Sequence, residues 1–193
     1  MAKHITHVLK RMKEQVALIS NEDEDMQKQT LTEAQECAGF EEMHNRIVIG
    51  GYFNHLFFFS ILGAQGGASE PQGQLKEMID KHFTDYSGFK ESFKKVVAQR
   101  FQPGWVWLSI LPDGSKLLVT QTNNEDNTLM MGVIETKSIP IICLDLWEHS
   151  YWEEHEGSAN GSYVEQFFDN VDWQKVSKNF EDYNVKGQVA PLL

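Results

Sequence analysis

The sequence predicts an α+β fold in which helices fill the first half of the chain and a small sheet lies in the second half. Residues from about 4 to 98 have the character of helices interrupted by one glycine-containing loop. Residues from about 104 to 193 combine short strands, rich in large apolar side chains, with further helices. A chain of 193 residues is long enough for a sizeable core, in one domain or in two closely packed subdomains.

The helices of the first half are bounded by recognisable turn and loop signals. The acidic run at residues 21–25 is expected to face solvent, since nothing in it fixes a metal coordination geometry. The run at residues 52–62 is very apolar but too short to span a bilayer, which is typical of a buried core helix. Helices are expected from about residue 4 to 19, in a second stretch that continues through residues 47–62, and, after a glycine- and proline-containing loop, at 72–82 and 87–99.

Three short strands are predicted in the second half. The Pro-Asp-Gly sequence at residues 112–114 is a turn signal, so the strands on its two sides should pair. Pro140 is expected to be the first residue of the third strand, because proline is tolerated there but not in the middle of a strand. The predicted strands cover residues 104–111, 116–121 and 141–146, with helices from Tyr163 onward and an extended or docking tail after Tyr183.

Composition restricts the function classes. The formal net charge of −11 argues against a general nucleic-acid-binding surface, and no stretch is apolar and long enough for a transmembrane helix. The two cysteines, Cys37 and Cys143, provide no disulfide framework, as a reducing compartment would permit. The first 16 residues could form a basic amphipathic targeting helix, although Glu14 is unusual in such a segment and a helix of the fold is the preferred interpretation.

A candidate metal site emerges from three histidines and one aspartate. Asp145 follows an apolar run at residues 141–144, and a carboxylate at the end of a buried strand is costly unless it is paired or bound to a metal. His149 lies four residues later, His55 lies inside a very apolar helix-like run, and His7 lies in the first predicted helix. Singly, Asp145 could be a helix N-cap, His149 an interface residue and His55 a core histidine. Together, three imidazoles and one carboxylate suit iron or manganese.

Further motifs occur in a specific order along the chain. They are Asn54-His55 before a phenylalanine triplet, Gly-Gly-Ala-Ser-Glu-Pro at 66–71, Phe-Lys-Glu-Ser-Phe at 89–93, Gly-Trp-Val-Trp-Leu at 104–108, Asp-Leu-Trp-Glu-His-Ser-Tyr at 145–151, and Tyr163 with Asp172-Trp173. In this order, from about residue 47 to 173, the sequence resembles the iron/manganese superoxide dismutase family. The resemblance implies an N-terminal helical hairpin and then an α/β subdomain with a small three-stranded antiparallel sheet. The subdomains would span residues 1–98 and 99–193.

The resemblance also implies a ligand set. His7, His55, Asp145 and His149 match the four family ligands and would bind one iron or manganese ion per chain. His4 is an alternative to His7 as the first ligand. The function implied is superoxide dismutation, with activity that could be reduced.

The residues around the metal depart from the family pattern. A glutamine that donates a hydrogen bond to the solvent on the metal is matched by Glu125 in the manganese-type position and by Gly51 in the iron-type position. An ionised glutamate accepts hydrogen bonds but cannot donate one to this solvent, so the redox potential of the metal should be displaced. The alternative is that Glu125 merely faces solvent. The remaining expected site residues are Gln15 in place of a gateway tyrosine, Trp105 and Trp147 as an aromatic wall, and Glu148 as a contact to a second subunit, with Arg11 and Trp152 replacing a histidine–tyrosine pair at that interface.

The sequence is therefore compatible with two functions. The chain could be a metal-dependent dismutase, as a homodimer or as a heterodimer with a related subunit. Alternatively, it could be a non-catalytic structural subunit of a large assembly, such as a mitochondrial one, on the same fold. A mitochondrial location is expected from the resemblance, with the cytoplasm as the alternative.

Overall fold

The computed structural model describes residues 2–22, 30–63, 68–152 and 161–186, and within these ranges the side chains of 2–8, 20–22 and 183–186 are not described. Five helices precede the sheet: α1 (Ala2–Glu22), α2 (Leu31–Ala38), α3 (Met43–Ser60), α4 (Gly73–Phe83) and α5 (Tyr86–Ala98). The strands β1 (Gly104–Ile110), β2 (Leu117–Asn123) and β3 (Ile139–Asp145) follow, and then α6 (Glu148–Tyr151), α7 (Ser162–Asn170) and α8 (Trp173–Lys186). This order confirms the predicted α+β fold.

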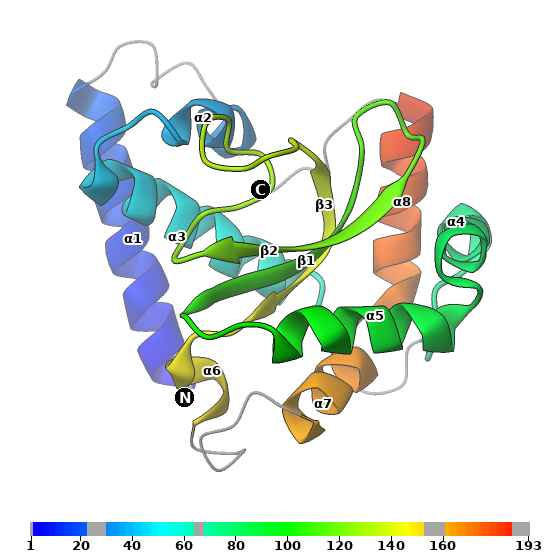
Figure 1. Ribbon diagram of the computed structural model, residues 1–193. Coiled ribbons are helices and arrows are strands. Elements are labelled where there is room, and N and C mark those ends of the chain that lie inside the picture. Colours follow the sequence, from blue (N-terminus) through cyan, green and yellow to red (C-terminus); the bar gives the residue numbers. More distant parts are fainter. Residues whose placement is uncertain (1, 23–29, 64–67, 153–160, 187–193) are drawn as a thin grey trace.

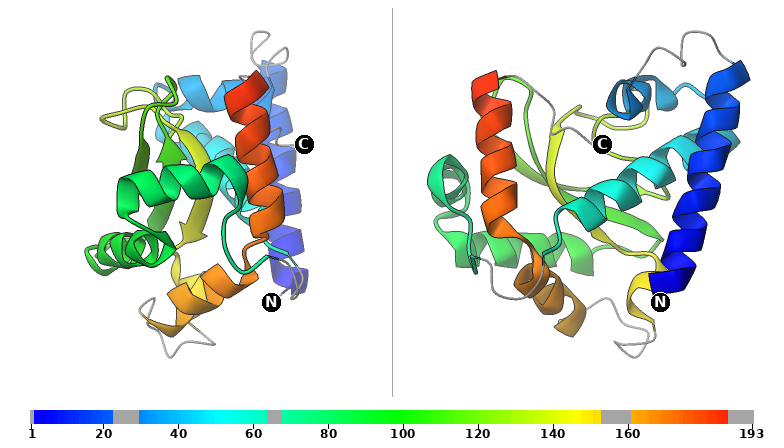
Figure 2. Two further views of the ribbon diagram at one scale, coloured as in Figure 1. Left: turned by 90° about the vertical axis from the view of Figure 1, so that its right-hand side faces the viewer. Right: turned by 180° about the vertical axis from the view of Figure 1, so that it is seen from behind.

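The sheet has the order β2-β1-β3, and both pairings are antiparallel. Every residue of β1 and of β3 is buried, which matches their nearly continuous apolar sequences. Helix α3 packs against β3, and α5 packs against β1 and β2, so that helices cover the sheet on both faces (Figures 1 and 2). The site described below lies where α3 meets the end of β3.

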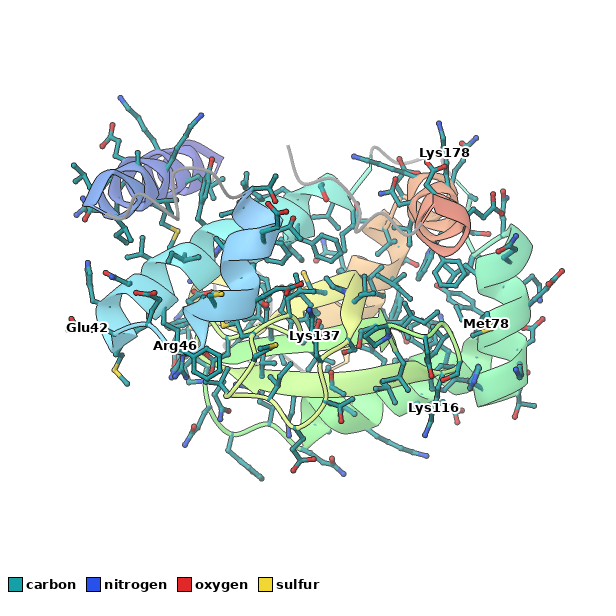
Figure 3. The ribbon with its side chains drawn as sticks, turned by 90° about the horizontal axis from the view of Figure 1, so that it is seen from above. Glu42, Arg46, Met78, Lys116, Lys137 and Lys178 are labelled. Atoms are coloured by element: carbon teal, nitrogen blue, oxygen red, sulfur yellow. The ribbon has the colours of Figure 1, made fainter. Side chains whose placement is uncertain are left out.

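Helices α1 and α2 both pack on α3 (Figures 1 and 2). A capping box starts α2, in which Thr30 and Glu33 satisfy each other's backbone N–H groups. Glu36 of α2 forms an ion pair with Lys137, which Figure 3 labels on the segment that leads into β3. The N-terminal helices are thereby joined to the sheet half of the chain.

One large hydrophobic core unites the helical half with the sheet. Trp105 and Trp107 of β1 are fully buried in it together with Phe53 of α3. Among the described residues, no helix combines the length and apolar character that crossing a bilayer requires. The division into subdomains at residue 98 stays a prediction, although all helices up to α5 end by Ala98 and all strands begin after it.

Two predicted boundaries were wrong. The expected continuous second helix is divided into α2 and α3 by a break at residues 39–42, where Gly39 packs so closely that an added Cβ would lie 2.0 Å from the Met131 carbonyl oxygen. Pro140 is the second residue of β3, not the first. It is tolerated because β3 is an edge strand and the register shifts opposite it, between Leu108 and Ser109. The start of the predicted tail is helical to Lys186, and residues 187–193 lie outside the described part.

Candidate metal centre

The end of β3 and the start of α6 present two polar side chains to one point. Asp145 is the last residue of β3, and its Oδ1 accepts a hydrogen bond from the backbone N–H of Trp147 at 2.9 Å. This bond holds the carboxylate so that Oδ2 faces His149, whose Nε2 lies 3.1 Å away. The short helix α6 therefore starts in a way that fixes the orientation of both side chains.

Helix α3 supplies the third side chain. His55 Nε2 lies 3.7 Å from Asp145 Oδ2 and 3.5 Å from His149 Nε2. His55 Nδ1 lies 2.7 Å from the carbonyl oxygen of Gly51, one turn earlier. Because a carbonyl only accepts, Nδ1 carries the proton and Nε2 presents a lone pair to the other two groups.

This arrangement fits a cation. Ligand atoms that share one ion at bond lengths of about 2.0–2.2 Å must lie roughly 3–4 Å apart, and the three distances of 3.1, 3.5 and 3.7 Å fall in that range. Burial lowers the pKa of His55 and keeps it neutral, whereas the hydrogen bond to Asp145 raises the pKa of His149. Without a cation, a proton on His149 must satisfy the carboxylate. Metal binding would displace that proton.

The predicted first ligand cannot be placed in the same way. His7 belongs to the early part of α1, and its side chain and that of His4 lie outside the described side chains. A ligand from α1 therefore stays a prediction.

Aromatic rings enclose the three side chains. Trp105 is fully buried and meets the His55 ring edge-on, with ring centroids 5.1 Å apart. It reaches this position because Trp105 pairs with Asp145 in the β1–β3 register. Trp147 stacks on His149 at 6.2 Å. These two rings, which were predicted as an aromatic wall, pack against the imidazoles of His55 and His149, and His149 stays partly exposed.

Glu125 lies in this enclosure and not in solvent. Only 5% of Glu125 is exposed, and its Oε2 accepts hydrogen bonds from Trp105 Nε1 at 2.9 Å and from Asn54 Nδ2 at 3.2 Å. Gly51 makes room for it, since an added Cβ there would lie 3.3 Å from both Cγ and Cδ of Glu125. The alternative that Glu125 turns to solvent is therefore wrong.

The protonation state of Glu125 also differs from the prediction of an ionised group. Burial, reinforced by the charge of Asp145, raises the pKa of Glu125 from 4.5 to about 8. Its carboxyl group is then mainly neutral at neutral pH. Because two donors occupy Oε2, the proton belongs on Oε1. A neutral Glu125 combines an acceptor and a donor in the same way as a glutamine amide.

Comparison with known proteins identifies the family. The family model for "Iron/manganese superoxide dismutases, C-terminal domain" matches residues 71–179. The chain belongs to the iron/manganese superoxide dismutase family. It is 38% identical over 133 residues to a superoxide dismutase [Mn] of Acinetobacter baylyi, covering 69% of this chain and 57% of that protein. It is 37% identical over 131 residues to a superoxide dismutase [Mn] of Pseudomonas aeruginosa, covering 68% and 61%.

A third relative, a superoxide dismutase [Mn/Fe] of Methylomonas sp., is 37% identical over 133 residues, covering 69% of this chain and 62% of that protein. The chain thus spans about three fifths of the length of these superoxide dismutases. The family membership accounts for the matching motifs and for the α+β fold.

Three of the predicted residues of this superoxide dismutase family member face outward. Gln15 on α1 and Glu148 on α6 are exposed, and Trp152 is 58% exposed. The side chain of His149 is itself 48% exposed. The structure thus brings His55, Asp145, His149, Trp105, Trp147 and Glu125 together and leaves Gln15, Glu148 and Trp152 on the surface.

Sequence reasoning missed the polar side chains behind Glu125. Asn127 and Gln35 are fully buried and connect to Glu125 through Asn54. Gln35 lies in an otherwise ordinary amphipathic helix, and Asn127 lies in a polar loop, so neither position carries a local signal of burial. Only the packing of α2 against α3 and the 123–131 segment reveals them.

Proposed function

We propose that this chain binds one iron or manganese ion and catalyses the dismutation of superoxide, at a rate below that of its manganese-type relatives. The observation that supports this most directly is the convergence of His55 Nε2, Asp145 Oδ2 and His149 Nε2 within one ion's reach. His7 would complete the set from α1. The bound metal would supply one-electron exchange with superoxide.

The chain's own residues prepare this chemistry. The Gly51 carbonyl fixes the tautomer of His55, and Trp105 and Trp147 exclude water from the apolar side of the centre. Neutral Glu125 would hold a transferable proton on Oε1 near the metal site. A glutamine amide in the same place could donate a hydrogen bond but could not act as an acid. The exposed Gln15, in place of a tyrosine, is the reason for expecting a reduced rate.

A second candidate function is structural association without catalysis. The exposed Trp152, next to the half-exposed His149 and the charged Glu148, favours a surface that is covered by a second protein. A second copy of this chain or a related subunit would fit it, and a mitochondrial assembly stays a proposal drawn from sequence resemblance alone.

A dismutase assay separates the two functions. The parent protein, loaded with manganese or with iron, should consume superoxide, and His55→Ala and His149→Ala should each abolish the activity. His82→Ala is the matched control, because His82 lies on α4 with its Nδ1 2.8 Å from the Met78 carbonyl oxygen, in the same kind of helical contact as His55. Metal-loaded parent protein without activity would favour the structural role.

A further inference from the structure

A row of buried amide side chains leads from α2 to Glu125. Gln35, Asn127 and Asn54 are each fully buried, and they come from three separate parts of the chain. Asn127 Nδ2 donates to Gln35 Oε1 at 2.8 Å and to Asn54 Oδ1 at 3.1 Å. Asn54 Nδ2 donates to Glu125, at 3.0 Å to its carbonyl oxygen and at 3.2 Å to Oε2. Fully satisfied buried networks of this kind specify one arrangement.

Backbone groups fix the direction of the row. Gln35 Nε2 donates to the carbonyl oxygens of Leu31 at 3.0 Å and Ile49 at 3.4 Å. These oxygens only accept, so the oxygen of Gln35 must face Asn127. The Asn127 amide has one orientation as well, because its Oδ1 accepts from the backbone N–H of Leu129 at 3.1 Å. Both hydrogens of Asn127 Nδ2 are then committed to Gln35 and Asn54.

The consequence reaches the carboxyl group of Glu125. With its oxygen held by Asn127, Asn54 can present only its N–H₂ group to Glu125. Two donors, Asn54 and Trp105, therefore converge on Oε2, which leaves Oε1 as the oxygen that can carry the proton. Asn127, whose amide is oriented by Gln35 and by the Leu129 N–H together, thus decides through Asn54 which oxygen of Glu125 accepts and which can hold a proton.

We propose that Gln35 and Asn127 are positioning residues that set the orientation of the Glu125 carboxyl group through Asn54. This inference rests on the proposed function for its significance, since Glu125 borders the metal centre. The hydrogen-bond row itself exists independently of any metal. Its test therefore begins with metal-free protein.

The indole N–H of Trp105 reports directly on Glu125, because it donates to Oε2 at 2.9 Å. In metal-free protein labelled with ¹⁵N, Gln35→Leu and Asn127→Leu should each shift and broaden the Trp105 indole signal among the five tryptophans of the chain. Ser109→Ala is the matched control. It removes a buried hydrogen bond, between the hydroxyl groups of Ser109 and Ser138 at 2.8 Å, that does not belong to the row.

Non-additivity shows whether the residues act as one unit. The change in the Trp105 signal in the Gln35→Leu/Asn127→Leu double variant should be close to that of either single variant, not to their sum. If Gln35→Leu does not fold, Gln35→Asn shortens the same side chain by one methylene and should give the same shift. An unchanged Trp105 signal in folded Gln35 and Asn127 variants, or a change as large in Ser109→Ala, would overturn the proposal.

A second measurement on manganese-loaded protein separates this proposal from the proposed function. The Gln35 and Asn127 variants should keep the metal content of the parent, while the visible absorption band of the oxidised metal should move relative to the parent. A parent protein that binds no metal contradicts the proposed function but leaves the Trp105 result valid. An altered Trp105 signal with an unmoved absorption band would show that the row does not act on the metal centre, and would overturn its proposed role there.

Discussion

At the scale of single residues, Glu125 determines how this centre differs from one with glutamine in the same place. Its carboxyl group is enclosed by Trp105, Asn54 and the space above Gly51, and this burial keeps the proton on it at neutral pH. The motif residues His55, Asp145 and His149 could be predicted from sequence, because their spacing and apolar surroundings are local. The burial of Glu125 could not, since Asn-Asn-Glu-Asp at 123–126 has the composition of a solvent-exposed loop.

Glu125 should make the stability of the metal-free protein depend on pH. Its pKa is about 8 in the folded chain against an ordinary value of 4.5, so between these pH values the unfolded chain binds fewer protons. The free energy of unfolding should therefore fall as pH rises from about 5 to 8, by a few kcal/mol at most, at roughly 1.4 kcal/mol per pKa unit. Glu125→Gln should remove this part of the slope in urea unfolding. Equal slopes in the two proteins would contradict the burial argument.

The same residue should make dismutation depend on pH. Neutral Glu125 can donate from Oε1, whereas the ionised form cannot, so activity should decline as pH rises toward 8. A bound cation stabilises the carboxylate, which moves this decline to lower pH in the loaded enzyme. At pH values above this decline, Glu125→Gln should be more active than the parent, and its activity should depend less on pH. The rate of superoxide loss at constant ionic strength measures both proteins. Parallel profiles for parent and variant would exclude this role.

At the scale of elements, the site depends on an ion pair that holds the segment after β2 against α3. Arg46, labelled in Figure 3 near the start of α3, forms a two-point ion pair with Asp126 at 2.7 and 2.8 Å. Asp126 is adjacent to Glu125 and is only 7% exposed. Helix and strand positions followed from hydrophobic pattern and turn signals. The ion pair between Arg46 and Asp126 could not be predicted in this way, because the two residues are far apart in the sequence and no local pattern indicates their contact.

Removing this ion pair should be costly. Arg46→Met would leave the Asp126 carboxylate with little water and without its partner, and we expect the free energy of unfolding to fall by about 1–3 kcal/mol. Lys10→Met is the control, since the Lys10–Glu14 pair is exposed, its atoms are 4.0 Å apart, and such pairs contribute roughly 0–1 kcal/mol. Urea unfolding at pH 7 measures both. Equal losses of unfolding free energy in Arg46→Met and Lys10→Met would show that the Arg46–Asp126 ion pair does not stabilise the fold.

At the scale of the whole molecule, the candidate centre joins the two halves of the chain. His55 comes from the helical half, whereas Asp145 and His149 come from the end of the sheet and from α6. The open side of the centre, where His149 is half-exposed, continues into the surface that carries Glu148 and Trp152. Within the part of the chain that the structure describes, the His149 side of the site is therefore left open.

Association through this surface should be measurable. We expect a dimer at micromolar concentration in light scattering, and Trp152→Ala should weaken it most, since exposed aromatic residues dominate interface energies. Phe101→Ala is a control, because Phe101 is 95% exposed but lies in the segment between α5 and β1, outside the proposed interface. If both the parent and Trp152→Ala are monomers in light scattering, the chain does not self-associate through this surface. A related subunit would then be the partner to test.

One metal ion is expected to be held by His55, Asp145 and His149 together with His7. Elemental analysis of protein purified from cells supplied with iron and manganese tests it most directly. We expect one iron or manganese ion per chain in the parent and in His82→Ala, and no metal in His55→Ala or Asp145→Ala. A metal-free parent, or undiminished metal content in both site variants, would contradict it.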